Sequence, residues 1–298
     1  MKRVFLFVLT NIAVLLVLSI VTHVLGVDRW LTMRGLNYGM LLAFSAVVGF
    51  TGSFISLAIS KWMAIHAYDI QIIKSPANSD QAWLSDKIGE LAQKAHIPKP
   101  EVGIYESPEV NAFATGASQR HSLVAVSSAL LGGMREEEIE GVLAHEISHI
   151  ANGDMVTMTL LQGVLNTFVV FLSRVLGFVI DQAMRRGDDE REQMGTGIGF
   201  YIASFLCQIV FSVLASLIVM SFSRRREFRA DAGAAALKGK HSMIAALQRL
   251  QQVSEHGGVL DERSASVSAF KINNKAGSLF ASHPPLEARI AALEKLPS

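Results

Sequence analysis

Long apolar runs without charged residues constrain this chain of 298 residues more than any other feature. Residues 4–27, 35–60 and 194–223 contain no Asp, Glu, Lys or Arg. A further run over 155–180 is interrupted only by Arg174. A helix rises about 1.5 Å per residue, so about 20 residues cross the roughly 30 Å hydrocarbon core of a bilayer. The sequence therefore predicts a mainly α integral membrane protein with about four transmembrane helices.

The first run could be a signal peptide, because it follows Lys2 and Arg3. It is longer than the apolar part of a typical signal peptide, and no A-x-A-like cleavage site follows it. A second apolar run also begins soon after, so we expect a retained anchor. Arg174 makes the third run the weakest span, since a buried arginine must reach the headgroups or face protein or water.

These runs divide the chain into a membrane hairpin (1–60), a polar region (61–154), a second membrane hairpin (155–223) and a second polar region (224–298). Basic residues flank the runs at Lys2 and Arg3, at Lys61 and Lys74, and at Arg224, Arg225, Arg226 and Arg229. By the positive-inside rule these clusters face the cytoplasm. Both polar regions are therefore expected on that side, although the loop at 181–193 carries three arginines as well.

Composition argues against two other classes of protein. The net charge is +1 and no basic surface with interleaved aromatic residues is evident, so we expect no nucleic-acid partner. The one cysteine, Cys207, excludes an intramolecular disulfide and therefore a disulfide-bridged secreted scaffold.

The polar regions have an α+β pattern. Apolar residues recur at helical spacing in 81–96, 135–153, 241–250 and 285–296, strand patterns occupy 101–107 and 122–131, and a flexible loop is expected over 255–270.

An H-E-x-x-H motif lies in the predicted helix 135–153, with His145, Glu146 and His149 as its named residues. Residues four apart share a helix face, so both imidazoles can bind one ion, and zinc accepts imidazole nitrogens at about 2.0–2.1 Å. Glu146 lies beside the pair and can deprotonate a water on the metal. The motif is short, so the alternative is a helix with two histidines and a glutamate on its solvated face.

Catalytic zinc needs a third protein ligand and an open fourth position. Asn152 and Met155 stand where the metzincin pattern has glycine and histidine, so the third ligand must come from elsewhere. Glu227 is the leading candidate, because the second hairpin returns the chain to the same side of the membrane. Asp231 follows on the same helical face, where it could hydrogen-bond a ligand histidine. The alternative for Glu227 is a counter-ion of the neighbouring arginines.

Four segments together resemble the HtpX family of membrane-embedded zinc metallopeptidases: "HEISHIANGDMVTMTLLQGVLNTF", "FSRRREFRADAGAA", "NAFATG" and "HPPLEARI". The resemblance covers nearly the whole chain. It implies a cytoplasmic zincin-like (gluzincin-type) catalytic domain with one zinc per subunit, held by His145, His149 and Glu227, and Glu146 as general base. It also implies a bacterial inner membrane protein that acts in quality control of misfolded membrane proteins under stress.

Two further segments each have two interpretations. Residues 111–116 are an ordinary strand and turn or, as in the wider fold of such peptidases, an edge strand that pairs with an extended substrate. Asn111 and Ala114 would then line the cleft. His283 is either a histidine near a helix N-cap in a rigid turn or, because similar peptidases place a histidine there, an electrophile that stabilises the oxyanion.

The sequence thus predicts a membrane-bound zinc endopeptidase whose partners are protein substrates, chiefly membrane proteins, and the lipid bilayer. The main alternative is a metal-binding membrane transporter or sensor without proteolysis. A transporter should carry polar groups near the midplane of several spans, and here such groups are few. An inactive scaffold is a third possibility. The intact Glu146 argues against it, because structural zinc sites need no base.

Overall fold

The computed structural model describes residues 35–184, 196–255 and 282–297, together with residues 16, 19–20, 23–24 and 26–33. Most of the predicted loop at 255–270 and most of the first predicted span lie outside the described residues. The chain divides into two compact units. One contains residues 1–54 and 159–216, and the other contains residues 55–158 and 217–298.

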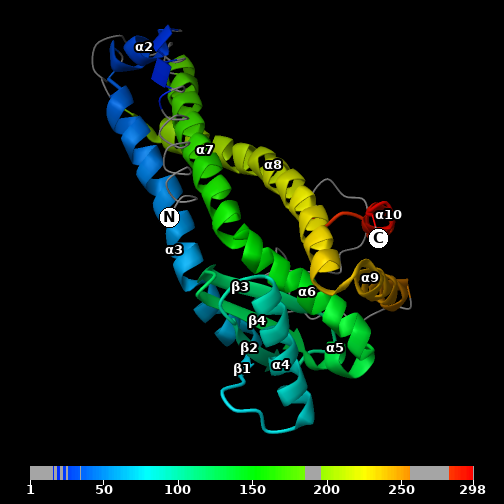
Figure 1. Cartoon of the computed structure of the whole chain (residues 1–298). Helices are drawn as coiled ribbons and strands as arrows, with labels where there is room; N and C mark the ends of the chain where they lie inside the picture. Colours follow the sequence, from blue (N-terminus) through cyan, green and yellow to red (C-terminus); the bar gives the residue numbers. More distant parts are fainter. Residues whose placement is uncertain are drawn as a thin grey trace. The chain divides into compact units, whose positions relative to one another are not determined.

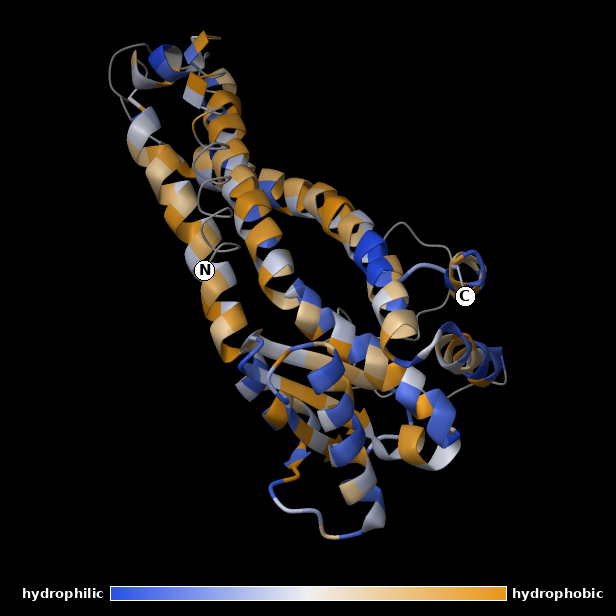
Figure 2. Cartoon of the chain, in the orientation of Figure 1, coloured by the Kyte–Doolittle hydropathy of each residue, from blue (hydrophilic) through white to orange (hydrophobic). Residues whose placement is uncertain are grey.

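Three helices among the described residues are long and apolar enough to cross a membrane: α3 (Tyr38–Tyr68), α7 (Asp154–Met184) and α8 (Ile198–Lys238). Figure 2 shows long apolar stretches along all three. They coincide with the second, third and fourth apolar runs of the sequence, and the short helix α2 (Val27–Met33) precedes α3. The described part of the chain therefore contains three candidate membrane spans, as expected for a membrane protein.

Small residues bring these helices together in the first unit. A Cβ on Gly49 would lie 2.5 Å from the Oγ1 atom of Thr167, and one on Gly177 would lie 2.1 Å from the Oγ atom of Ser204. Such close approach is typical of helix packing in membranes, where van der Waals contact drives association. Arg174 also faces protein here. Its guanidinium carbon is 4.8 Å from the centre of the Phe44 ring.

The second unit contains a four-stranded sheet in the order β1-β2-β4-β3 (Figure 1), formed by β1 (Gln71–Ile72), β2 (Glu101–Tyr105), β4 (His121–Ser127) and β3 (Ala112–Ser118). β2 and β4 are parallel, and the other two pairs are antiparallel. The predicted strand over 122–131 is wrong in its second half. Ser127 ends the strand, because its hydroxyl accepts the Leu130 N–H as the N-cap of α5 (Ser128–Gly133).

Four further helices complete this unit: α4 (Ser79–Lys94), α6 (Glu136–Asn152), α9 (Lys240–Glu255) and α10 (Leu286–Glu294). α6 is the central one, since every residue from Glu138 to Ile150 is buried. α9 packs closely on it, because a Cβ on Gly141 would lie 2.5 Å from the Ser242 carbonyl oxygen. The apolar core includes residues of α4, β4, α6 and α9, among them Leu84, Ile88, Val124, Leu143 and Leu247.

The strand alternation places β3 against α6. Ala112 and Ala114 belong to the core that contains α6, whereas Phe113 packs with Tyr68 and Tyr105 on the opposite face of the sheet. Successive side chains of a strand point to opposite faces, so one face of β3 packs toward α6, the helix that contains the H-E-x-x-H motif. β3 ends the sheet, with β4 as its strand neighbour among the described elements.

Candidate metal centre

α6 holds the H-E-x-x-H motif in a buried, well-defined helix. At its start, the Glu138 carboxylate accepts the backbone N–H of Arg135 at 2.8 Å and the Arg135 guanidinium at 2.7 Å. At its end, Gly153 adopts the left-handed conformation (φ 65°, ψ 35°) and its N–H bonds back to the Ile150 carbonyl. His145, Glu146 and His149 are all buried between these ends.

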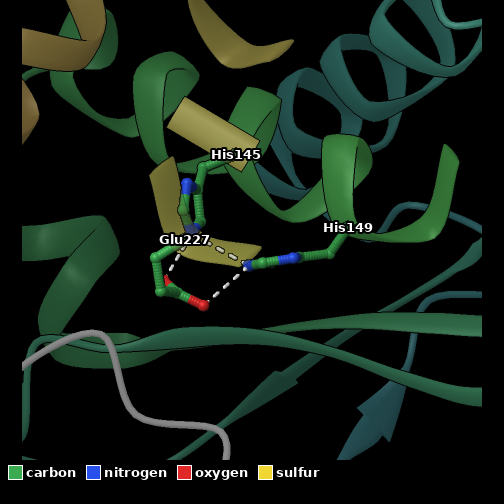
Figure 3. A group of neighbouring side chains, drawn as sticks. All are labelled: His145, His149 and Glu227. Atoms are coloured by element: carbon green, nitrogen blue, oxygen red, sulfur yellow. Dashed lines mark hydrogen bonds and ion pairs between the residues drawn. The ribbon is translucent and has the colours of Figure 1, made fainter. Parts of the chain in front are cut away.

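The structure brings His145, His149 and Glu227 together (Figure 3). The two Nε2 atoms of the histidines are 3.1 Å apart. Glu227 comes from α8 and is fully buried, with its carboxylate oxygens 3.3 Å from each of these nitrogens. Donors about 2.0–2.1 Å from a tetrahedral ion are roughly 3.3–3.4 Å apart, so the spacing of this cluster fits zinc. The counter-ion interpretation of Glu227 is incomplete, because both histidines contact it.

His145 is oriented by a buried chain of charged groups. Its Nδ1–H donates to Asp231 at 2.9 Å, and Asp231 accepts two hydrogen bonds from Arg289, at 2.6 and 2.8 Å. Burial alone would lower the pKa of the His145 imidazole, but the hydrogen bonds to Asp231 and Glu227 raise that pKa to about 9. The expected contact between Asp231 and a histidine of the motif is therefore present. Arg289 was not predicted, since an arginine in a short amphipathic helix normally lies in solvent.

His149 has a carboxylate partner of its own. Its Nδ1 atom is 2.7 Å from the Oδ2 atom of Asp154, which is fully buried at the start of α7. Asp154 was not predicted either. It follows His149 by five positions, a spacing that does not place two side chains on one face of an unbroken helix. The available signal was Gly153, the residue type that most often ends a helix.

Glu146 is buried beside the two histidines. Burial is the main cause that raises the pKa of its carboxyl group, and the charge of Glu227 acts in the same direction. The neighbouring histidines and a hydrogen bond from the Ala114 backbone oppose this rise. The hydrogen bond links the glutamate of the motif directly to β3.

Asn111 and Ala114, the two residues of the edge-strand hypothesis, lie just before and within β3. Asn111 directly precedes β3, and its backbone N–H and C=O both bond to Ser127, at 3.1 and 2.9 Å. Its side-chain oxygen is buried and has no hydrogen-bond partner among the described residues. Ala114 lies within β3 and contacts Glu146 through its backbone.

His283 also reaches the cluster, although it lies far from the motif in the sequence. Its Nδ1–H donates to the Oε2 atom of Glu227 at 2.8 Å, and its Nε2 atom is buried without a partner among the described residues. Burial lowers the pKa of the His283 imidazole, against the attraction of Glu227. Pro285 is the N-cap of α10, so His283 belongs both to the turn before that helix and to the site.

Comparison with known proteins agrees with this geometry. Residues 78–297 match Peptidase family M48. Relatives named Protease HtpX homolog from Methylacidiphilum infernorum, Prosthecochloris aestuarii and Nitrosomonas eutropha are 57%, 55% and 52% identical to this chain, each over 99% of both chains. A crystal structure of S. mikatae Ste24p has a TM-score of 0.62 at 18% identity. The similarity covers 99% of this chain and 67% of the Ste24p chain, and it shows the fold. The match over most of the chain and the full-length relatives together show that the protein belongs to Peptidase family M48.

Proposed function

We propose that this protein is a membrane-bound zinc endopeptidase with its active site at the cluster on α6 and α8. One observation carries the proposal. Two histidines and a glutamate converge with tetrahedral spacing, and a second buried glutamate with a raised pKa lies beside them. A structural zinc site needs four closed ligands and no base, whereas this arrangement offers three ligands and a base. The arrangement therefore favours catalysis over transport or sensing.

In this proposal His145, His149 and Glu227 hold the zinc ion. Asp231 accepts the Nδ1–H of His145, which leaves the Nε2 lone pair of that histidine free to bind the metal. When bound, zinc supplies Lewis acidity toward a water molecule and toward the carbonyl of the scissile bond. The ligand set contributes one negative charge, so the bound ion keeps a net positive charge.

Glu146 is the general base. Burial raises the pKa of its carboxyl group, which makes the carboxylate a stronger proton acceptor than an exposed glutamate. It takes a proton from the attacking water and passes it to the leaving amine. Its hydrogen bond from Ala114 ties this proton transfer to the strand where the substrate would lie.

Substrate binding is assigned to β3. An extended peptide can pair with an edge strand through main-chain hydrogen bonds. The side-chain oxygen of Asn111 is buried and unpartnered among the described residues, so it could accept an N–H of such a peptide. Ala114 would then set the position of the peptide relative to Glu146.

His283 is proposed as the electrophile that stabilises the oxyanion. The role needs a proton on Nε2 while Nδ1–H bonds to Glu227. Burial lowers the pKa of the His283 imidazole and opposes this doubly protonated form, whereas the negative charge of Glu227 favours it. Donors aimed at developing charge typically contribute a factor of about 100 to 1,000 in kcat.

The cellular setting is proposed from less direct support. The apolar helices and the basic clusters beside them favour a bacterial inner membrane protein with its active site toward the cytoplasm. Relatives of similar length are named HtpX proteases. Misfolded or damaged membrane proteins, cleaved in quality control during stress, are the proposed substrates.

Cleavage of a casein-like substrate by the purified protein in detergent tests this function. Glu146→Gln should abolish cleavage while the variant keeps its zinc, measured by metal analysis of the same sample. Full activity of Glu146→Gln would contradict the mechanism. Metal transport into proteoliposomes by a preparation that cleaves nothing would instead favour the transporter.

A further inference from the structure

Both histidines of the cluster direct their second nitrogen to a buried aspartate, and the two aspartates differ in what holds them. Asp231, the partner of His145, bonds to Arg289, whose side chain is fully buried. Asp154, the partner of His149, uses its other oxygen to accept the Nη2–H of Arg229 at 2.7 Å. The side chain of Arg229 is 56% exposed. The series of contacts from His149 through Asp154 to Arg229 therefore ends at an exposed side chain.

The backbone at the end of α6 creates the contact of Asp154 with His149. In an unbroken helix, five residues turn the chain by about 500°, so the two side chains would point in different directions. Gly153 interrupts the helix with φ of 65° and ψ of 35°, and α7 begins at the next residue. The redirected chain places the Asp154 carboxylate 2.7 Å from the Nδ1 atom of His149.

Two arginines of α8 lie around this carboxylate. Arg229 bonds to Oδ1, and the Nε atom of Arg226 is 4.0 Å from Oδ2. A buried carboxylate needs such partners, since an isolated charge in the interior is costly. Asp154 itself is fully buried, so its two short contacts hold the carboxylate in one position.

We propose that Asp154 is the positioning residue of His149 and that Arg229 holds Asp154 in place. By accepting the Nδ1–H, Asp154 fixes the ring and leaves the Nε2 lone pair directed at the metal position. This inference rests on the proposed function, because it takes His149 as a zinc ligand.

The zinc affinity of the full-length protein in detergent, measured by competition with a chromophoric chelator, tests the inference. Asp154→Ala should weaken zinc binding about 10- to 100-fold, the usual effect of losing a hydrogen-bond partner of a ligand. Arg229→Gln should weaken it by about two- to fivefold, because ion pairs of exposed side chains are weak. Arg225→Gln is the matched control, with the same charge change on an exposed residue one turn earlier in α8, and it should bind zinc like the parent.

Three further measurements make the outcome unambiguous. If Asp154 is purely structural, Asp154→Ala should lower the melting temperature of the metal-free protein and leave its zinc affinity unchanged. That result would overturn the inference. Asp154→Leu nearly keeps the size of the side chain and can accept no hydrogen bond, so it gives the same test if the alanine variant does not fold. His149→Ala separates the two proposals. If His149→Ala keeps zinc, the proposed metal site is wrong. If His149→Ala loses zinc and Asp154→Ala does not, only the role of Asp154 is contradicted.

Discussion

The ion pair between Arg289 and Asp231 gives a quantitative test of how the centre is built. The arginine side chain is fully buried, the aspartate side chain is 2% exposed, and two hydrogen bonds of 2.6 and 2.8 Å join them. Replacement of Arg289 by methionine keeps most of the buried volume and removes the arginine partner of Asp231, so the buried aspartate charge keeps only its contact with His145. Breaking a buried pair in this way costs about 3–5 kcal/mol.

Thermal unfolding of the metal-free protein in detergent, followed by circular dichroism, measures this cost. At roughly 2–4 °C per kcal/mol for a domain of about 150–250 residues, Arg289→Met should lower the melting temperature by about 6–20 °C. The double variant Arg289→Met with Asp231→Asn no longer buries the aspartate charge without its arginine. It should therefore melt no lower than Arg289→Met alone.

Zinc affinity should not recover with stability. In the double variant the partner of His145 has lost its charge, so binding should remain about 10- to 100-fold weaker than in the parent. If the destabilisations of the two single variants simply add in the double variant, the residues are not coupled, and the buried chain from Arg289 to His145 is refuted.

The remaining predictions concern ligands, catalysis and topology. Glu227→Ala should weaken zinc affinity by more than the roughly 100-fold expected for a residue that only holds a ligand in place. A metal content equal to that of the parent would mean that another residue is the third ligand. His283→Ala should lower kcat about 100- to 1,000-fold with zinc retained, and an unchanged kcat would return this residue to a structural role. Removal of zinc with a chelator should abolish cleavage and lower the melting temperature, and added zinc should restore both. Single cysteines placed at 181–193 should react with a membrane-impermeant reagent only from the outer side; labelling from the cytoplasm would contradict four full spans.

Periodicity and run length made the main features of this protein predictable. A charge-free run long enough to span a bilayer has few soluble alternatives, and all three such helices of the described part were expected. The motif was equally clear, because a spacing of four residues fixes two side chains on one helix face. Glu227 was a candidate ligand because the second hairpin returns the chain to the same side of the membrane as the motif.

The residues that sequence reasoning missed depend on a break in local structure or on tertiary contact. Asp154 reaches His149 only because Gly153 ends α6, so the usual helical spacing does not reveal it. Arg289 contacts Asp231 across 58 positions of sequence, and no local pattern records that contact. The segment that became α5 is an apolar run, which fits a buried strand and a helix equally well until the cap at Ser127 is seen.

The position of β3 at the edge of its sheet has a consequence for which polypeptides could be cleaved. Main-chain hydrogen bonds to such a strand are the same for every residue type except proline, so binding by strand addition reads little of the side-chain sequence. A polypeptide must instead offer a stretch whose own backbone groups are unpaired. A folded helix or an interior strand has none free, because its N–H and C=O groups are already bonded. Selection at this strand would therefore depend on the loss of native structure in the target, and correctly folded neighbours in the same membrane would escape without any recognition signal.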